Sequence, residues 1–316
     1  MNAAEKTGWW GVAARLAVTI LCGVVLFFAI DVRALWSSLS MLSPLALLAA
    51  VLLQISIVLM LGWRWRSIVG AVGQMATFGW AARLTFATTF FNMILPLSIG
   101  GDVGRIWFGR QAGVDLRTGL TVAILDRLAG LIGLALLLCV SALLLPTGWL
   151  PQEVRLCMVL LFPFMLVGLW LIAAFSGAGV SHWLALQWLG DVATKAKLFV
   201  RQPGPLCLAI AQSLAGHVMS VTIVFVCARG LDIQLAFGHA LLLVPVILLA
   251  TMLPFSIGGW GLREASAIMV LSLAGVAAEY ALALALILGV TQLIVSGAGT
   301  LACFGWARVS LGRVRP

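Results

Sequence analysis

Two short stretches of the chain combine proline, paired glycines, serine and arginine, and these residue types together can receive an anion. A proline ends a helix, and the glycines after it let the backbone turn tightly or approach a ligand. The helix that follows starts with unpaired amides and the positive end of its dipole, which favour a bound negative charge such as phosphate. We therefore predict a substrate-binding site at these stretches, with Pro96 and Pro254 as the structural breaks. The predicted binding residues are Ser98, Gly100, Gly101, Asp102 and Arg105 in the first stretch and Ser256, Gly258, Gly259, Arg263 and Glu264 in the second.

The arginines of the two stretches need an explanation of their own. Arg105 and Arg263 fall in the first turn of the helix expected after each break, where a cation opposes the helix dipole. A bound phosphate is one explanation, because guanidinium groups bind phosphate strongly. Internal pairing, of Arg105 with Asp102 and of Arg263 with Glu264, is the other. The sequence leaves both open, and different conformational states could use them in turn.

Asp126 and Arg127 belong to the predicted site as well, because they lie inside an apolar segment. A charge at that depth in a bilayer costs about 2.5–3.5 kcal/mol on insertion scales. Adjacent helix positions diverge by about 100°, so the two side chains need separate partners. We expect Arg127 to pair with Asp102 and Asp126 to pair with Arg105. A structural network and a substrate or proton site both explain such pairs.

Four further polar residues lie in or beside apolar segments. Gln54 and Gln212 are expected either to join spans by hydrogen bonds or to contact the substrate. Arg64 and Arg66 flank Trp65 at the predicted end of a span, and we interpret them as anchors at the inner membrane face.

We expect no metal, no cofactor and no enzymatic activity. The three histidines are dispersed, and the six cysteines lie in apolar stretches without a CxxC pair. The sequence contains no GxxxxGK[ST], HExxH or GxSxG motif.

The composition requires lipid as the solvent of this chain. Of its 316 residues, 63% are hydrophobic and 9% are charged, and the mean hydropathy is +1.16. Soluble domains carry about 25% charged residues. We therefore predict an all-α polytopic membrane protein, a single integral membrane domain over residues 1–316.

The apolar pattern predicts six transmembrane helices and two broken segments. A span needs about 20 apolar residues. The predicted spans are 11–30, 44–62, 118–145, 154–175, 204–228 and 278–305. Residues 80–112 and 238–276 are apolar but interrupted by proline and glycine, and we predict that both are re-entrant helical hairpins.

The two broken segments indicate an internal repeat. The pattern P-x-S-I-G-G with a trailing arginine occurs at Pro96 and again 158 residues later at Pro254. Repeat 1 is expected at about 44–145 and repeat 2 at about 202–303. Because an odd number of crossings separates their starts, the second copy should be inverted, which is the architecture of alternating-access transporters.

The charge distribution predicts how the chain lies in the membrane. The net charge is +9, and with both hairpins re-entrant most Lys and Arg residues fall on one side. Positive loops stay in the cytoplasm, so we expect an inner-membrane protein with cytoplasmic N- and C-termini. An amphipathic linker over about 176–201 should lie on the inner surface. No basic segment is interleaved with aromatic residues in a polar region, so nucleic acid is not an expected partner.

The motifs together resemble the flippase-like membrane domain associated with lysyl-phosphatidylglycerol synthases, which also has stand-alone members. The resemblance rests on Phe90 to Asn92, Pro96, Gly100 to Arg105, Asp126-Arg127 and Pro254 to Glu264, and it extends over about 60–300. It implies translocation of anionic or headgroup-modified lipids between leaflets. Since the synthase's aminoacyl-transferase domain is not in this sequence, we expect a stand-alone member without lysyl transfer.

Three functional hypotheses follow. The first is a lipid flippase or transporter that moves an anionic, phosphate-headgroup lipid, either a phospholipid or a polyprenyl-phosphate-linked lipid, by alternating access. The second is an integral-membrane transferase that acts on a lipid-linked substrate with Asp126 or Glu264 as general base. The third is a non-transporting scaffold for a lipid-modifying enzyme. The partners expected are a membrane lipid and, in the third case, that enzyme, and a homodimer through a glycine-rich face is compatible with all three.

Overall fold

The computed structural model describes residues 39–95, 100–111, 114–145, 151–174, 184–252 and 256–305, together with Ala17 and Ile20. The regular elements in these residues are helices. They are α3 (Pro44–Ala71), α4 (Phe78–Ile94), α5 (Gly100–Gln111), α6 (Leu116–Leu144), α7 (Gln152–Ala174), α8 (Leu184–Val200), α9 (Pro203–Gly230), α10 (Phe237–Met252), α11 (Leu262–Leu271), the 3-10 turn η3 (Ser272–Ala274) and α12 (Ala278–Gly305). The predicted all-α class is confirmed.

Five helices are long and apolar enough to cross a membrane: α3, α6, α7, α9 and α12. They correspond to five of the six predicted spans. Proline occupies the first position of α3 and of α9, where its fixed φ suits a helix start. Asp115 caps α6 by accepting hydrogen bonds from the amides of Arg117 and Thr118. The sixth predicted span, 11–30, lies outside the described residues apart from Ala17 and Ile20 and stays a prediction.

The two segments with proline and paired glycines are each broken into two short helices. The first consists of α4 and α5, and the second of α10 and α11. The order of long and short helices is the same in α3–α6 and in α9–α12. Pro96, Ser98 and Pro254 lie outside the described residues. The re-entrant course of the broken segments and the inversion of the second repeat stay predictions.

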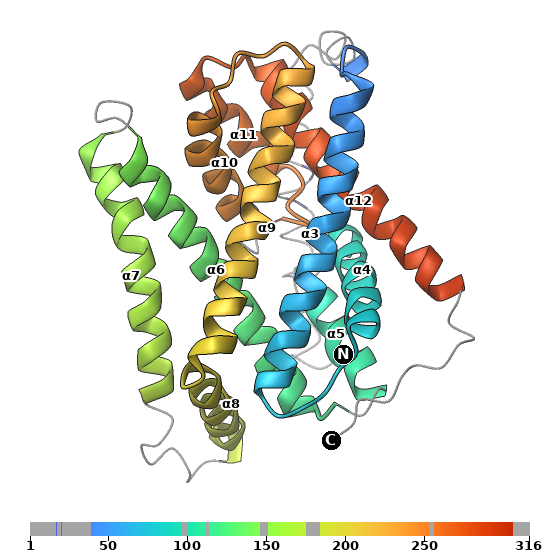
Figure 1. Ribbon diagram of the computed structural model, residues 1–316, viewed down its shortest axis with the longest axis vertical. Helices are drawn as coiled ribbons and strands as arrows, with labels where there is room; N and C mark the ends of the chain where they lie inside the picture. Colours follow the sequence, from blue (N-terminus) through green and yellow to red (C-terminus); the bar gives the residue numbers. More distant parts are fainter. Residues whose placement is uncertain are drawn as a thin grey trace. The chain divides into compact units, whose positions relative to one another are not determined.

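The chain forms two compact units. Unit 1 consists of Met1–Ser56, Ala87–Gly101 and Met219–Ala298, and unit 2 consists of Ile57–Phe86, Asp102–Val218 and Gly299–Pro316. Each unit therefore contains residues of both predicted repeats. Within unit 1, α10 and α11 pack against each other (Figure 1).

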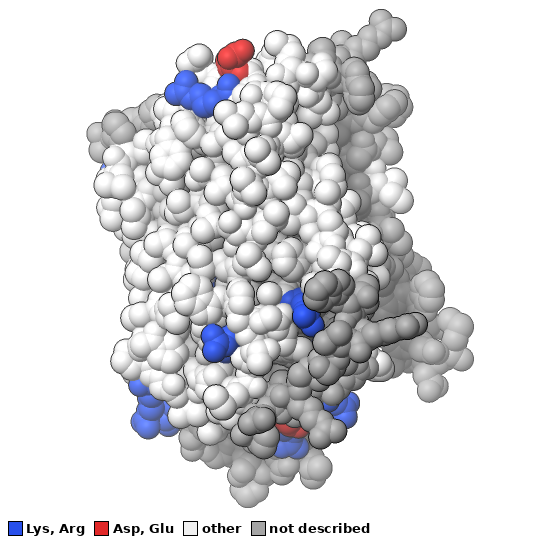
Figure 2. Space-filling view, turned by 45° about the vertical axis from the view of Figure 1, so that its right-hand side comes forward, with Lys and Arg blue, Asp and Glu red and all other residues white. Residues whose placement is uncertain are grey.

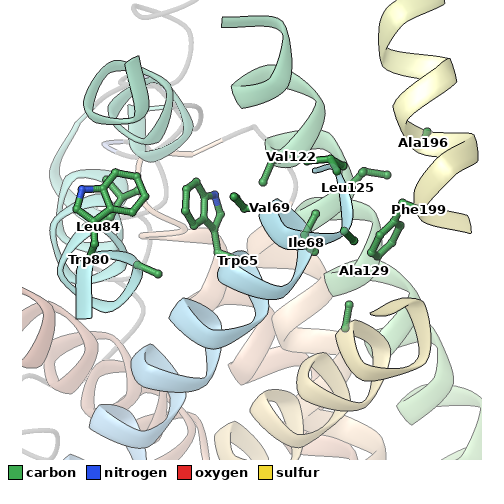
Figure 3. Packing of buried hydrophobic residues seen from close by; sticks show 14 residues of the cluster. Trp65, Ile68, Val69, Trp80, Leu84, Val122, Leu125, Ala129, Ala196 and Phe199 are labelled. Carbon is green, nitrogen blue, oxygen red and sulfur yellow. The ribbon is translucent and has the colours of Figure 1, made fainter. Parts of the chain in front are cut away.

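A hydrophobic core within unit 2 joins residues of α3, α4, α6, α8 and α9 (Figure 3). The rings of Trp65 of α3 and Trp80 of α4 pack with their centroids 5.2 Å apart and their planes tilted by 49°. Leu125 of α6 and Phe199 of α8 complete the cluster and are almost fully buried. The burial of these side chains is the main source of stability for such a cluster.

Helix α8 falls in the predicted amphipathic linker. Its Phe199 belongs to the core of unit 2, and the ammonium group of Lys195 donates a hydrogen bond to the Thr118 hydroxyl of α6. The predicted helix is therefore observed, and one of its faces packs on protein. Its position on the inner membrane surface stays a prediction.

Helix α7 is the most exposed of the five candidate spans. It packs on α6 and α8 (Figure 1). Only 6% of the apolar 18-residue stretch of α7 is buried, against 61% of the corresponding stretch of α12. The large side chains of Leu160, Phe164 and Trp170 are exposed. Uncharged residues also cover most of the described surface on the face drawn in Figure 2. Such surfaces suit a lipid environment.

Candidate anion-binding site

Three charged side chains meet in the interior of unit 2. Arg64 comes from α3, Arg105 from α5 and Asp126 from α6. Arg64 donates from Nε to Asp126 Oδ1 at 2.8 Å, and Arg105 donates from Nη1 to Asp126 Oδ2 at 2.7 Å. Arg64 also donates from Nη1 to Ser213 Oγ of α9 at 2.8 Å. We call Arg64, Arg105, Asp126 and Ser213 the arginine cluster.

Counted over its own residues, the arginine cluster holds two guanidinium groups and one carboxylate, which is a formal excess of one positive charge. Arg64, Arg105 and Asp126 are only 6%, 9% and 4% exposed. Buried guanidinium groups form strong, charge-assisted hydrogen bonds with anions such as carboxylate and phosphate. The cluster is therefore suited to receive one more negative charge.

A second ion pair lies beside the cluster and adds no net charge. Arg127 of α6 donates from Nε to Asp102 Oδ2 in the first turn of α5. The Asp102 side chain is 11% exposed, whereas that of Arg127 is 48% exposed. Both predicted pairings, Arg127 with Asp102 and Arg105 with Asp126, are observed. Their part in binding a substrate stays a prediction.

The interpretation of Arg64 as a surface anchor is wrong. Helix α3 continues to Ala71, so Arg64 lies inside the helix and its side chain reaches Asp126. Arg66 is exposed, and its Nε donates to the Ala76 carbonyl. Residues two positions apart on a helix point about 200° apart, so one arginine can face inward while the other faces outward. This geometry was the signal in the sequence that could have revealed Arg64.

Gly133 of α6 leaves room for the cluster. A Cβ added to Gly133 would overlap the Ser213 side chain, whereas one added to Gly130 would lie at ordinary contact distance, 3.6 Å, from Arg64 Nη1. The Nε2 atom of His217 on α9 lies 3.0 Å from the Gly130 carbonyl oxygen. Small residues therefore allow α6 and α9 to approach closely around the Arg64 guanidinium.

In the second broken segment, which lies in unit 1, the neighbouring carboxylate pairs with the arginine. Arg263 donates from Nε and Nη2 to Glu264 Oε1 at 3.0 and 2.8 Å, and both residues are 3% exposed. The Gly261 amide donates to Glu264 Oε2, so this carboxylate also caps α11. The Arg263 guanidinium lies 4.4 Å from the centre of the Trp260 ring. Of the two explanations for Arg263, the structure shows the internal pairing.

The two broken segments touch within unit 1. The Trp260 indole donates from Nε1 to the Met93 carbonyl at 3.2 Å, close to the end of α4. Gly258 has a φ of 58°, and a Cβ there would lie 2.6 Å from the Met93 carbonyl oxygen. Only glycine permits this approach. At the start of α5, the Gly101 amide donates to Asn92 Oδ1 at 2.7 Å.

The remaining predicted site residues of unit 1 carry no charged side chain. Ser256 is 2% exposed, and its hydroxyl has no hydrogen-bond partner among the residues that the structure describes. Gly259 has a φ of 79° and approaches Thr251. Gly100 is the first residue of α5. The structure thus collects the predicted residues into two groups, with Asp102, Arg105, Asp126 and Arg127 in unit 2 and the others that it describes in unit 1.

Comparison with known protein families matches residues 12–299 to the family described as the lysylphosphatidylglycerol synthase TM region. The chain belongs to this family. The resemblance predicted from the sequence motifs is confirmed, and the match includes every residue of the arginine cluster. A similar protein is the UPF0104 membrane protein of Methanothermobacter thermautotrophicus, which is 22% identical over 298 residues and is matched over 85% of each chain. Family membership and the apolar helices together make the chain a multi-pass membrane protein.

Proposed function

We propose that this member of the lysylphosphatidylglycerol synthase TM family transports an anionic lipid between the leaflets of the inner membrane. The observation that carries the proposal is the arginine cluster itself, in which two buried guanidinium groups share one carboxylate inside a chain that is otherwise strongly apolar. Ionisable residues inside a membrane protein mark substrate pathways more often than they serve packing alone. The family's name refers to synthases of a phospholipid, which supports a lipid as the ligand.

The geometry of the cluster suits a phosphate group. Asp126 orients the two guanidinium groups from its opposite oxygens. Arginine binds phosphate through charge-assisted hydrogen bonds with a fixed fork geometry. A phosphate beside Arg64 and Arg105 neutralises the excess charge, while its acyl or polyprenyl chains stay in the lipid. In this proposal, Asp126 positions the arginines and does not touch the substrate.

The second broken segment has a different part in the proposal. Because Glu264 already neutralises Arg263, this segment contributes little attraction for an anion. Its link to Met93 instead ties the two broken segments together within unit 1. We propose that it is a pivot about which an inverted repeat alternates, with re-entrant hairpins and both termini in the cytoplasm.

We propose transport and not a chemical step. Asp126 and Glu264, the carboxylates considered as general bases, are each held by arginine. Both oxygens of each carboxylate already accept hydrogen bonds, from Arg64 and Arg105 at Asp126 and from Arg263 and the Gly261 amide at Glu264. Neither is therefore well placed to take a proton from a substrate.

Reconstitution into liposomes tests the proposal. Phosphatidylglycerol with a fluorescent acyl chain is quenched by dithionite only in the outer leaflet, so the rate of quenching reports movement between leaflets. The variant Arg105→Gln removes the excess charge and should slow this movement about tenfold or more, because a charge-assisted hydrogen bond contributes about 1.5–3 kcal/mol. Arg66→Gln is the matched control, since Arg66 is exposed on the same helix as Arg64. Movement at the wild-type rate in a folded Arg105→Gln protein would contradict the proposal.

A further inference from the structure

An imidazole lies beside the arginine cluster, and the proposed function does not use it. His217 follows Ser213 by four residues on α9, so the two side chains lie on one face of this helix, one turn apart. Ser213 Oγ accepts a hydrogen bond from Arg64 Nη1 at 2.8 Å. His217 Nε2 lies 3.0 Å from the Gly130 carbonyl oxygen, and a Cβ added to Gly130 would lie 3.6 Å from the same Nη1. Two separate sets of contacts therefore place the imidazole next to the Arg64 guanidinium.

The contact with Gly130 determines which nitrogen of His217 can take up a proton. A carbonyl oxygen only accepts hydrogen bonds, so Nε2 carries a hydrogen and donates it to Gly130. In the neutral imidazole, Nδ1 is then the nitrogen without a hydrogen. A proton that Nδ1 takes from water converts the ring to an imidazolium and leaves the bond from Nε2 in place. The ring can therefore change its charge without losing the contact that holds it.

The charges around the imidazole depend on whether an anion is bound. Among the described residues, Arg64 is the charged side chain that acts on His217 electrostatically. Asp126 of α6 has both oxygens bound, one by Arg64 and the other by Arg105 of α5. The other charged residue of α9 is Arg229, in the last turn of this helix. A guanidinium beside the ring disfavours the imidazolium, and a phosphate bound to that guanidinium favours it.

We propose that His217 is a proton-binding residue of the transport site, and that a lipid phosphate binds at the arginine cluster together with one proton on Nδ1 of His217. This inference rests on the proposed function, because it requires an anion at the same cluster. A phosphodiester and one proton together carry no net charge. Their joint movement therefore responds to a pH gradient and not to the membrane potential, which acts on moved charge.

Calorimetric titration of the purified protein in detergent counts the protons that are taken up with the lipid. The probe is short-chain phosphatidylglycerol, a phosphodiester that keeps one negative charge between about pH 5 and pH 8, where histidine titrates. Titrations in buffers of different ionisation enthalpy give the number of protons bound per lipid. Because the lipid-bound state holds the additional proton, we expect the affinity of the wild type to increase as the pH falls, by up to about tenfold per pH unit.

The variant His217→Gln keeps a donor for the Gly130 carbonyl and does not titrate in this pH range. It should bind the lipid without proton uptake, with an affinity that no longer depends on pH and that matches the wild type at the alkaline end of the range. His239→Gln is the matched control, since His239 lies on α10 in unit 1. It should keep both the proton uptake and the pH dependence.

Nitrogen NMR of the ¹⁵N-labelled histidines supports the test without a variant at position 217. At constant pH, the lipid should convert one neutral imidazole to an imidazolium, and His239→Gln should retain this signal. A spectrum in which the lipid leaves every imidazole in its charge state overturns the inference, even where His217→Gln does not fold.

The outcomes separate the two proposals. A wild type that moves lipid in the liposomes but binds it without proton uptake overturns the inference alone, as does an uptake that His217→Gln retains. A wild type that moves no lipid contradicts the proposed function, and proton uptake on binding then decides whether His217 binds a proton with the anion.

Discussion

Asp126 is the residue on which the buried charges of unit 2 depend. It is the carboxylate that Arg64 and Arg105 share, and all three side chains are almost fully buried. The fixed position of Asp126 in the middle of α6 sets where the two guanidinium groups lie. An anion that arrives at the cluster therefore meets donors that are already oriented, which lowers the entropic cost of binding.

We predict that Asp126→Asn destabilises the protein by about 3–5 kcal/mol, because it removes the carboxylate that two buried guanidinium groups share. The measurement is chemical unfolding of the purified protein in mixed micelles. Glu153→Gln is the control: Glu153 is exposed in the first turn of α7, and its loss should change stability by less than about 0.5 kcal/mol. Equal stability of the two variants would show that the cluster contributes nothing to the fold.

The sequence predicts which single residues belong to the site where a charged residue lies in an apolar segment. Asp126 and Arg127 stand out in an apolar segment, and the requirement for separate partners leads to Arg105 and Asp102. Arg64 was missed because α3 was expected to end at residue 62, before its tryptophan and arginine run. Average polarity indicates where a span leaves the membrane, but it does not indicate which face of a helix its neighbours bury.

At the scale of elements, Gly289 lets α12 approach the buried Arg263. A Cβ added to Gly289 would overlap the Arg263 guanidinium. This guanidinium cannot move freely, because Glu264 binds it and the Trp260 ring covers it. The absence of a side chain at Gly289 is therefore required by packing.

We predict that Gly289→Ala destabilises the protein by about 1–3 kcal/mol through overpacking. Gly168→Ala on α7 is the matched control, since nothing lies within 4 Å of a Cβ there. In the helix interior, alanine is favoured over glycine by up to about 1 kcal/mol, so the control should be neutral or more stable. Chemical unfolding of both variants decides the point, and stabilisation by Gly289→Ala would mean that α12 does not approach Arg263 so closely.

The elements themselves followed from two simple features of the sequence. Apolar length predicted five of the spans, and proline with paired glycines predicted the two breaks. The packing of α8 was not predictable, because its amphipathic pattern suits a membrane surface and a protein surface equally. The buried Phe199 and the hydrogen bond from Lys195 to Thr118 show that one face packs on unit 2.

At the scale of the whole molecule, the compact units do not coincide with the predicted repeats. Each unit combines residues of both repeats, and α3, α4, α5, α9 and α12 each contribute to both units. A sequence repeat reports ancestry along the chain, whereas a compact unit reports which side chains pack together. Among the described ion pairs, that of unit 1 joins Arg263 to Glu264 one to one, whereas in unit 2 Arg64 and Arg105 share Asp126.

The central claim is that a lipid phosphate binds beside Arg64 and Arg105 as the molecule moves it. Solid-state NMR on the protein in phosphatidylglycerol bilayers measures it directly, through dipolar coupling between the lipid ³¹P and ¹⁵N-labelled arginine side chains. We predict a phosphorus–nitrogen distance of about 4 Å to guanidinium nitrogens that are protected from solvent, as hydrogen-bonded pairs require, and loss of this signal in Arg105→Gln but not in Arg66→Gln. A signal that persists in Arg105→Gln, or that comes only from exposed arginines, would contradict the account.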